Sequence, residues 1–93
     1  GVIGTDNLNS VLQEALNPKG TTPTLGHGRK FLTGDKVMQI KNNYKKGVFN
    51  GDIGIIMEIS PHDQELVVQM EDKEVVYEFS ELDELVLAYA VSI

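Results

Sequence analysis

The first part of the chain carries apolar residues at the spacing of an α-helix. They recur every three or four positions, as Leu8, Val11, Leu12, Ala15 and Leu16. This spacing predicts one apolar stripe on a helix that Asp6 can cap and that ends at Asn17, because Pro18 disfavours the helical conformation in the residue before it. A single amphipathic helix cannot bury its stripe alone, so we expect the stripe to pack on the rest of this chain or on a larger body outside it.

Further along, the pattern changes to the alternation that is typical of β-strands. Residues 53–60 predict a half-buried strand with Ile53, Ile55, Met57 and Ile59 on one face and Gly54, Ile56, Glu58 and Ser60 on the other. Turn-forming residues at 60–63 lead into a second alternating strand, with Leu66, Val68 and Met70 on one face. These two strands are expected to form a hairpin.

Two more strands extend the hairpin into a meander. The polar turn 71–74 precedes a strand whose inward set is expected to be Val75, Tyr77 and Phe79. Another strand, 36–41, follows the Gly34-Asp35 turn and places Val37 and Gln39 opposite Met38 and Ile40. Small β modules usually protect their edges by closing into a barrel, and a fifth strand can come from 29–32 or from 86–93. The sequence therefore predicts a mainly β fold, a small barrel.

The spacing of turn and apolar residues divides the chain into four segments. We predict a helical segment at 1–18, a flexible linker rich in Gly, Thr and Pro at 19–28, the barrel at 29–84 and a final strand at 85–93. Ser80-Glu81-Leu82-Asp83 has the spacing of a capping box and predicts one helical turn at the end of the barrel. The nearly continuous apolar run after it is typical of a strand buried on both faces.

Composition narrows the class of protein further. The 93 residues include 41% hydrophobic and 24% charged residues and no cysteine, which indicates a folded domain without disulfides or a Cys-based zinc site. A signal-peptide layout and a membrane-spanning apolar run are both missing, so we expect a cytoplasmic protein without a membrane partner. His27 and His62 are isolated turn residues, and a phosphate-cradling G-x-x-x-x-G-K-[ST] loop is lacking. We therefore expect no catalytic residue, cofactor or metal site in this segment.

The charge is unevenly distributed. A formal net charge of −6 argues against a nucleic-acid partner, but six basic residues fall between positions 29 and 46, where Asp35 is the only acid: Arg29, Lys30, Lys36, Lys41, Lys45 and Lys46. Taken alone, such a run favours a solvated face. The basic run indicates a function only in combination with a sequence motif that overlaps it, which is described next.

The runs Gly-Asp-Lys-Val-Met-Gln-Ile-Lys-Asn-Asn-Tyr (34–44) and Val-Phe-Asn-Gly-Asp-Ile-Gly (48–54) closely resemble a signature of RecD-like superfamily 1 DNA helicases, the family of the exodeoxyribonuclease V alpha chain. The flanking segments 4–18 and 87–93 also resemble this family. The resemblance implies an SH3-like barrel inserted into the second motor lobe, with 1–18 and 85–93 derived from that lobe. It covers nearly the whole chain apart from the linker.

The resemblance also implies a parent protein and its partners. The parent would be an ATP-dependent 5′-to-3′ DNA helicase acting in DNA repair and recombination, which uses ATP and Mg²⁺ bound outside this segment. A chain of 93 residues is too short for both motor lobes, so this segment would be inactive alone. The implied partners are single-stranded DNA and the remaining helicase lobes, with other subunits of a RecBCD-like complex left open.

Within the motif, one loop combines amides, an aromatic ring and ammonium groups. We expect it to guide single-stranded DNA across the second lobe without sequence readout, by stacking and phosphate attraction, through Lys41, Asn42, Asn43, Tyr44, Lys45, Lys46 and Asn50. The alternative for this loop is structural, with Asn42 and Asn43 bonded to their own turn and Tyr44 packed on the barrel rim. Asn50-Gly51 predicts a tight turn, and Gly54 predicts a bulge or a close backbone approach.

Two other functions remain open on the sequence. A KOW-type RNA-binding barrel also carries a Gly-Asp-x-Val strand and a later glycine, although Asn42-Asn43-Tyr44 and the flanking segments disfavour it. A protein-docking module of the helicase, without DNA contact, would use the acidic half of the chain to meet a basic partner.

Overall fold

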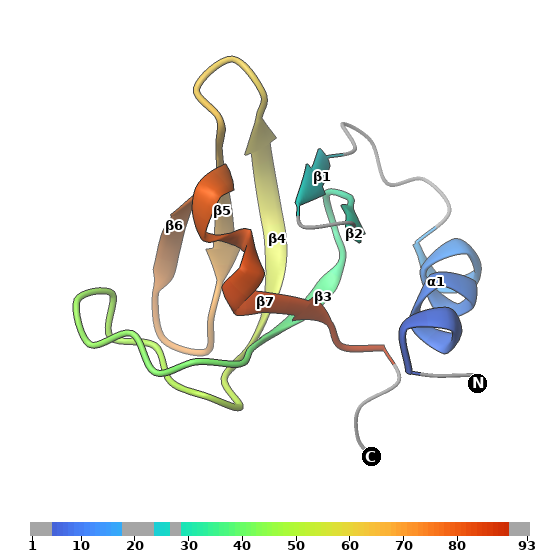
Figure 1. Ribbon diagram of the computed structural model, residues 1–93, viewed down its shortest axis with the longest axis horizontal. Coiled ribbons are helices and arrows are strands. Elements are labelled where there is room, and N and C mark those ends of the chain that lie inside the picture. The colour runs from blue at the N-terminus through green and yellow to red at the C-terminus, as the bar shows by residue number, and fades with distance from the viewer. Residues whose placement is uncertain (1–4, 18–23, 27–28, 90–93) are drawn as a thin grey trace.

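The computed structural model describes residues 5–17, 24–26 and 29–89. Its elements follow one another as the helix α1 (Thr5–Leu16), the strands β1 (Thr24–Gly26), β2 (Arg29–Phe31), β3 (Lys36–Gln39), β4 (Ile53–Ser60), β5 (Glu65–Gln69) and β6 (Glu74–Glu78), the 3₁₀ helix η1 (Phe79–Glu84) and the strand β7 (Leu85–Leu87) (Figure 1). The strands predicted from alternation are all present.

Five strands form one antiparallel sheet in the order β6-β5-β4-β3-β7. The sheet curls around a single core, and β7 extends it at one edge by pairing with β3 (Figure 1). Both candidate fifth strands are used, since 29–31 forms β2 and pairs with β1 in a separate two-stranded sheet. The prediction of a mainly β, SH3-like small barrel is confirmed. β1 falls within the segment predicted as a linker at 19–28, and the four segment boundaries stay predictions.

The core is filled by the inward residues of these strands. Residues with at most 1% of their surface exposed include Phe31, Val37, Val48, Ile56, Leu66, Val68, Tyr77, Leu82 and Leu85. Val75 and Tyr77 face inward as predicted, and Phe79 packs against the core where η1 begins. The predicted helical turn is confirmed as η1, but its cap differs from the predicted Ser80-to-Asp83 box, because Glu81 Oε1 accepts a hydrogen bond from the Glu78 amide at 2.9 Å.

The predicted faces of β4 are wrong for Ile59. The pairing register with β5 shifts between Ile56 and Glu58, which is a β-bulge. An extra residue in one strand changes the phase of the alternation beyond it. Ile59 is therefore buried with Ile56, while Ile53, Ile55 and Met57 stay 38%, 40% and 50% exposed on the outer face.

The helix α1 meets the barrel with its polar side. Asn9 and Gln13 are buried, whereas Leu8, Val11 and Leu16 are 46%, 56% and 65% exposed. The apolar stripe therefore lacks cover from the described part of the chain, which is consistent with the second of the two predicted locations for its partner. The helix ends at Leu16, one residue before the predicted end at Asn17, and it begins at Thr5, so Asp6 lies inside it.

One buried carboxylate joins this helix to the barrel. Asp35 is 0% exposed and accepts hydrogen bonds from Asn17 Nδ2 at 2.8 Å, from the Leu32 amide at 2.8 Å, from the Tyr89 hydroxyl at 2.7 Å and from Gln13 Nε2. Burial, and then the hydrogen bond to Asp35, raise the pKa of Tyr89 to about 12, which keeps its hydroxyl a donor at neutral pH. Asp35 thus ties together residues before, within and after the barrel.

Candidate nucleic-acid interface

The loop between β3 and β4, residues 40–52, is called the tip loop here. It lies on the side of the barrel away from α1 and is drawn in green in Figure 1. Its first half is closed by an antiparallel bridge between Asn43 and Val48, with the Asn43 amide donating to the Val48 carbonyl at 2.7 Å. Gly47, at φ +70°, supplies the left-handed conformation that this turn needs. The tip loop is therefore an ordered, hydrogen-bonded structure.

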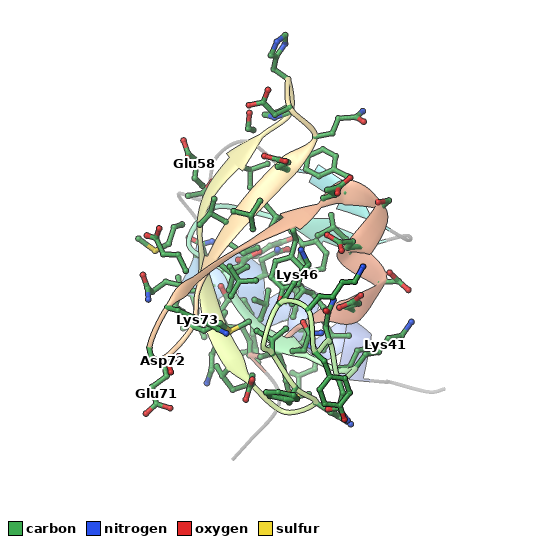
Figure 2. The ribbon with its side chains drawn as sticks, turned by 90° about the vertical axis from the view of Figure 1, so that its left-hand side faces the viewer. Lys41, Lys46, Glu58, Glu71, Asp72 and Lys73 are labelled. Atoms are coloured by element: carbon green, nitrogen blue, oxygen red, sulfur yellow. The ribbon has the colours of Figure 1, made fainter. Side chains whose placement is uncertain are left out.

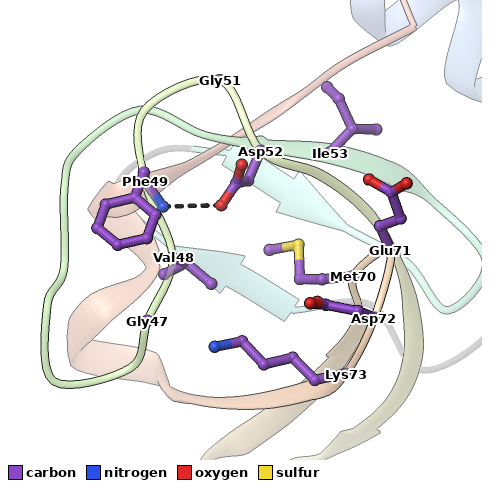
Figure 3. Close-up of a pocket in the computed structure, with 10 residues that line it drawn as sticks. All are labelled: Gly47, Val48, Phe49, Gly51, Asp52, Ile53, Met70, Glu71, Asp72 and Lys73. Carbon is purple, nitrogen blue, oxygen red and sulfur yellow. Dashed lines mark hydrogen bonds between the residues drawn. The ribbon is translucent and has the colours of Figure 1, made fainter.

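The second half of the tip loop is the tight turn predicted for Asn50-Gly51. The Asp52 amide donates to the Phe49 carbonyl at 3.0 Å, and Asp52 Oδ2 accepts the Phe49 amide at 2.9 Å (Figure 3). Gly51 occupies the turn at φ +101°, a conformation that residues with a Cβ rarely adopt. The turn leads the chain directly into β4 and fixes the orientation of Phe49.

A buried polar network supports the base of the tip loop. The Tyr77 hydroxyl donates to Gln39 Oε1 at 2.6 Å, and Gln39 Nε2 donates to Glu84 Oε1 and to the Lys41 carbonyl, each at 2.8 Å. Asn43 Nδ2 donates to the same Glu84 oxygen at 3.1 Å. Burial, followed by the nearby carboxylates, raises the pKa of Tyr77, so its hydroxyl remains a donor. Gln39, fully buried although polar, anchors the loop to η1 and β6.

Two of the three predicted tip-loop lysines are engaged by acids of η1. Lys41 Nζ lies 3.0 Å from Asp83 Oδ2, and this hydrogen bond and charge raise the pKa of Lys41. Lys46 Nζ lies 3.1 Å from Glu81 Oε1, donates to the Val76 carbonyl at 2.7 Å and sits 5.5 Å from the Tyr77 ring centre. Lys45 is exposed and makes no ion pair with any residue that the structure describes.

The predicted amides have structural tasks inside the loop. Asn42 Oδ1 accepts the Asn50 amide at 3.0 Å, and Asn43 Oδ1 accepts the Lys46 amide at 3.1 Å. The exposure of Asn42 and Asn50 leaves parts of their side chains open to a ligand, whereas Asn43 is half-buried. A DNA contact by these three residues stays a prediction, beside a turn-forming role that the hydrogen bonds establish for Asn42 and Asn43.

The tip loop also presents two aromatic rings to solvent. Tyr44 is 78% exposed, and its ring meets that of Phe49 edge to face, with 5.5 Å between ring centres and 68° between planes. Phe49 is 41% exposed and was not among the predicted site residues. Its place in the second motif run, next to a tight turn, was the available signal. Tyr44 contacts Phe49 instead of packing flat on the barrel, so the pair forms an exposed apolar tip.

A pocket of about 760 Å³ lies between the tip loop and the β5–β6 turn at 70–73 (Figure 3). Its wall includes the carboxylates of Asp52, Glu71 and Asp72 beside Lys73, whose Nζ donates to the Lys46 carbonyl at 3.0 Å. Three carboxylates against one ammonium disfavour a phosphate in this pocket. Lys73 links the β5–β6 turn to the tip loop through its hydrogen bond to Lys46. A phosphate is better accommodated outside this pocket, where Tyr44 and Lys45 are exposed.

The described residues contain neither a metal-binding cluster nor a membrane-spanning helix. His62 is exposed in the β4–β5 turn, and His27 lies outside the described residues. Within 5–17, 24–26 and 29–89, His, Asp and Glu do not form a group of three that could hold a metal ion. The only α-helix of this part of the chain, α1, is too short to cross a membrane.

A curled five-stranded sheet, a 3₁₀ helix before the last strand and a long ordered loop between β3 and β4 together define a small SH3-like barrel. Residues 8–70 match the family described as the SH3 domain of ATP-dependent RecD-like DNA helicases. The chain belongs to this family, as the two motif runs indicated.

Individual relatives agree with this assignment. The chain is 32% identical over its full 93 residues to the ATP-dependent RecD2 DNA helicase of Deinococcus radiodurans, of which it covers 13%. A structure of two coordinating Pif1 helicases at forked double-stranded DNA matches 67% of this chain and 17% of the Pif1 chain, with a TM-score of 0.55 and 27% identity. Bacteroides Pif1 bound to single-stranded DNA matches 81% of this chain and 21% of its own, with a TM-score of 0.59 and 18% identity, which supports the fold alone. The chain thus corresponds to a small part of these helicases.

Proposed function

We propose that this chain guides single-stranded DNA across the second motor lobe of an ATP-dependent, RecD-type 5′-to-3′ helicase. The observation that carries the proposal is the exposed Tyr44–Phe49 pair, next in sequence to the unpaired Lys45. Both lie on a loop whose base is held by the hydrogen bonds of Gln39, Asn43 and Glu84. Aromatic rings stack on any base, and an ammonium group attracts any phosphate, so this surface suits a strand of arbitrary sequence. In this proposal ATP and Mg²⁺ act at the motor lobes, and any RecBCD-like subunits contact other surfaces.

Family membership supports this proposal over the KOW-type alternative, and the experiments below test it against the docking alternative. A KOW-type RNA-binding barrel does not account for a match to the RecD-like family over residues 8–70. A docking module without DNA contact could use the same two exposed rings, because aromatic residues also anchor protein interfaces. It is the outcome if the experiments below fail.

Replacing both tip rings, as Tyr44→Leu with Phe49→Leu, is expected to weaken binding of single-stranded DNA by the full-length protein by about tenfold or more. Base stacking on one aromatic ring is worth about 1–3 kcal/mol, and leucine keeps apolar volume but offers no flat ring. Fluorescence anisotropy with a labelled oligothymidylate measures the change. Met57→Leu is the matched control, because Met57 is 50% exposed but lies on the outer face of β4. Unchanged affinity in the double variant would exclude stacking.

Lys45→Ala is expected to make the decrease of log affinity with log salt concentration less steep. The magnitude of the slope should fall by about 0.7, the value for one phosphate contact with a single strand. Lys41→Ala and Lys46→Ala should each change the slope less, because η1 carboxylates already neutralise these two ammonium groups. Lys36→Ala, the same change on β3, is the control. Equal slopes for Lys45→Ala and the unaltered protein would show that Lys45 makes no phosphate contact.

A further inference from the structure

The acids of η1 are aligned along the base of the tip loop. Asp83 contacts Lys41 at 3.0 Å, Glu81 contacts Lys46 at 3.1 Å, and Glu84 accepts Asn43 at 3.1 Å. Figure 2 shows Lys41 and Lys46 on the side of the molecule where the 3₁₀ helix runs past the tip loop. Each of the two ammonium groups therefore already has an anionic oxygen at the distance that a phosphate oxygen would take.

The two ion pairs differ in their exposure to solvent. The side chains of Lys41 and Asp83 are 56% and 40% exposed, whereas those of Lys46 and Glu81 are half-buried, at 22% and 27%. Exposed pairs of this kind contribute little to stability, so a phosphate can displace the carboxylate, but it gains only the difference between two similar interactions. The lysines then add less to DNA affinity than their charge suggests.

Glu84 has a different position. Its carboxylate receives Gln39 Nε2 at 2.8 Å as well as Asn43, within the network that holds the loop. A change at Glu84 would disturb the loop itself. Glu81 and Asp83 contact the lysines and lie outside the hydrogen bonds that join Glu84 to Gln39 and Asn43, so they are the acids to change.

We propose that Asp83 and Glu81 act as internal substitutes for phosphate, which limit the affinity of the tip loop for single-stranded DNA by competing for Lys41 and Lys46. This inference rests on the proposed DNA contact and adds to it the residues that set its strength. A weak contact suits a surface along which a strand must move, because every phosphate bound has to be released at the next step.

Asp83→Asn in the full-length protein is expected to raise affinity for an oligothymidylate about two- to fivefold, the factor that an exposed ion pair represents, and to steepen the salt slope by about 0.7. Asparagine keeps the size of the side chain and an accepting oxygen, so the fold should be retained, which a thermal unfolding midpoint checks. Glu81→Gln is expected to act in the same direction through Lys46, and its oxygen can still accept the Glu78 amide.

The matched control is Glu58→Gln, which removes one exposed charge on β4, far from Lys41 and Lys46 in Figure 2. The decisive comparison is the double variant Asp83→Asn with Lys41→Ala, which should bind no more tightly than Lys41→Ala alone. The inference is overturned if Asp83→Asn gives no gain, if Glu58→Gln gives an equal gain, or if the gain persists without Lys41. Failure of the proposed DNA contact is distinguishable, since the tip-ring and Lys45 variants would then bind like the unaltered protein.

Discussion

Asp35→Ala is expected to release α1 from the barrel and to lower the free energy of unfolding by about 3–5 kcal/mol. The fully buried carboxylate accepts hydrogen bonds from Gln13, Asn17, the Leu32 amide and Tyr89. A buried donor left without its partner costs about 1–3 kcal/mol, and water entering the space left by the side chain would recover only part of the total. The loss would exceed that of an average substitution because one side chain serves four donors.

Urea unfolding followed by circular dichroism measures this loss, and hydrogen exchange locates it. Amides of α1 should exchange faster in Asp35→Ala than in the unaltered chain, by a larger factor than those of β4 and β5. Asp63→Ala is the control, since Asp63 lies exposed in the β4–β5 turn and accepts only the Ser60 hydroxyl at 3.1 Å among the described residues. Equal stability of the two variants would mean that Asp35 does not hold the helix.

The Asp35 contacts also mark the limit of what the sequence could predict for α1. The three- and four-residue spacing correctly gave the helix and its apolar stripe, because helical periodicity is local. The spacing could not reveal that Asn9 and Gln13 would face the barrel, since Gln13 and Asn17 meet Asp35 across 22 and 18 residues of sequence. The described residues leave the apolar stripe exposed, and the chain covers 13% of its curated relative.

The strands show the same division between local and non-local information. Alternation located β3, β4, β5 and β6 and most of their inward residues. The phase of β4 beyond Ile56 was wrong because the bulge arises from pairing with β5, and alternation within one strand carries no sign of it. Pairing of the Arg29–Phe31 strand with Thr24–Gly26 was missed for a similar reason, since a Gly- and Thr-rich stretch has no periodicity.

The candidate site was predictable in place but not in detail. The motif runs and the basic stretch pointed to this loop, and Tyr44 is exposed there, but a DNA contact by these residues stays a prediction. The partners of Lys41 lie 42 residues later in the chain, at Asp83, so a local count of charges overstated the positive potential of the loop. Phe49 was overlooked because an aromatic residue in a strand-rich sequence usually predicts core, and only the turn geometry exposes it.

Gly54→Ala is expected to destabilise the barrel by about 2–3 kcal/mol, the upper part of the range for overpacking a filled core. A Cβ at this position would lie 2.5 Å from Val68 Cγ1, 2.7 Å from the Gln69 carbonyl oxygen and 2.8 Å from Met70 Sδ. The carbonyl belongs to the paired backbone of β5, so it cannot turn aside as a side chain can. The sequence prediction of a close backbone approach at Gly54 is thus confirmed, while the bulge lies three residues later.

A double-mutant cycle with Val68→Ala tests whether the clash is the cause. Val68→Ala should destabilise the barrel on its own, because Val68 is 0% exposed and its loss leaves a cavity. In the Val68→Ala background the added methyl group finds part of that space, so Gly54→Ala should cost less there than in the unaltered chain, by about 1 kcal/mol. Urea unfolding of the four proteins gives this coupling energy. Strictly additive effects would show that contact with Val68 is not the cause, and would leave the Gln69 carbonyl, 2.7 Å from the added Cβ, as the group that excludes a side chain from this position.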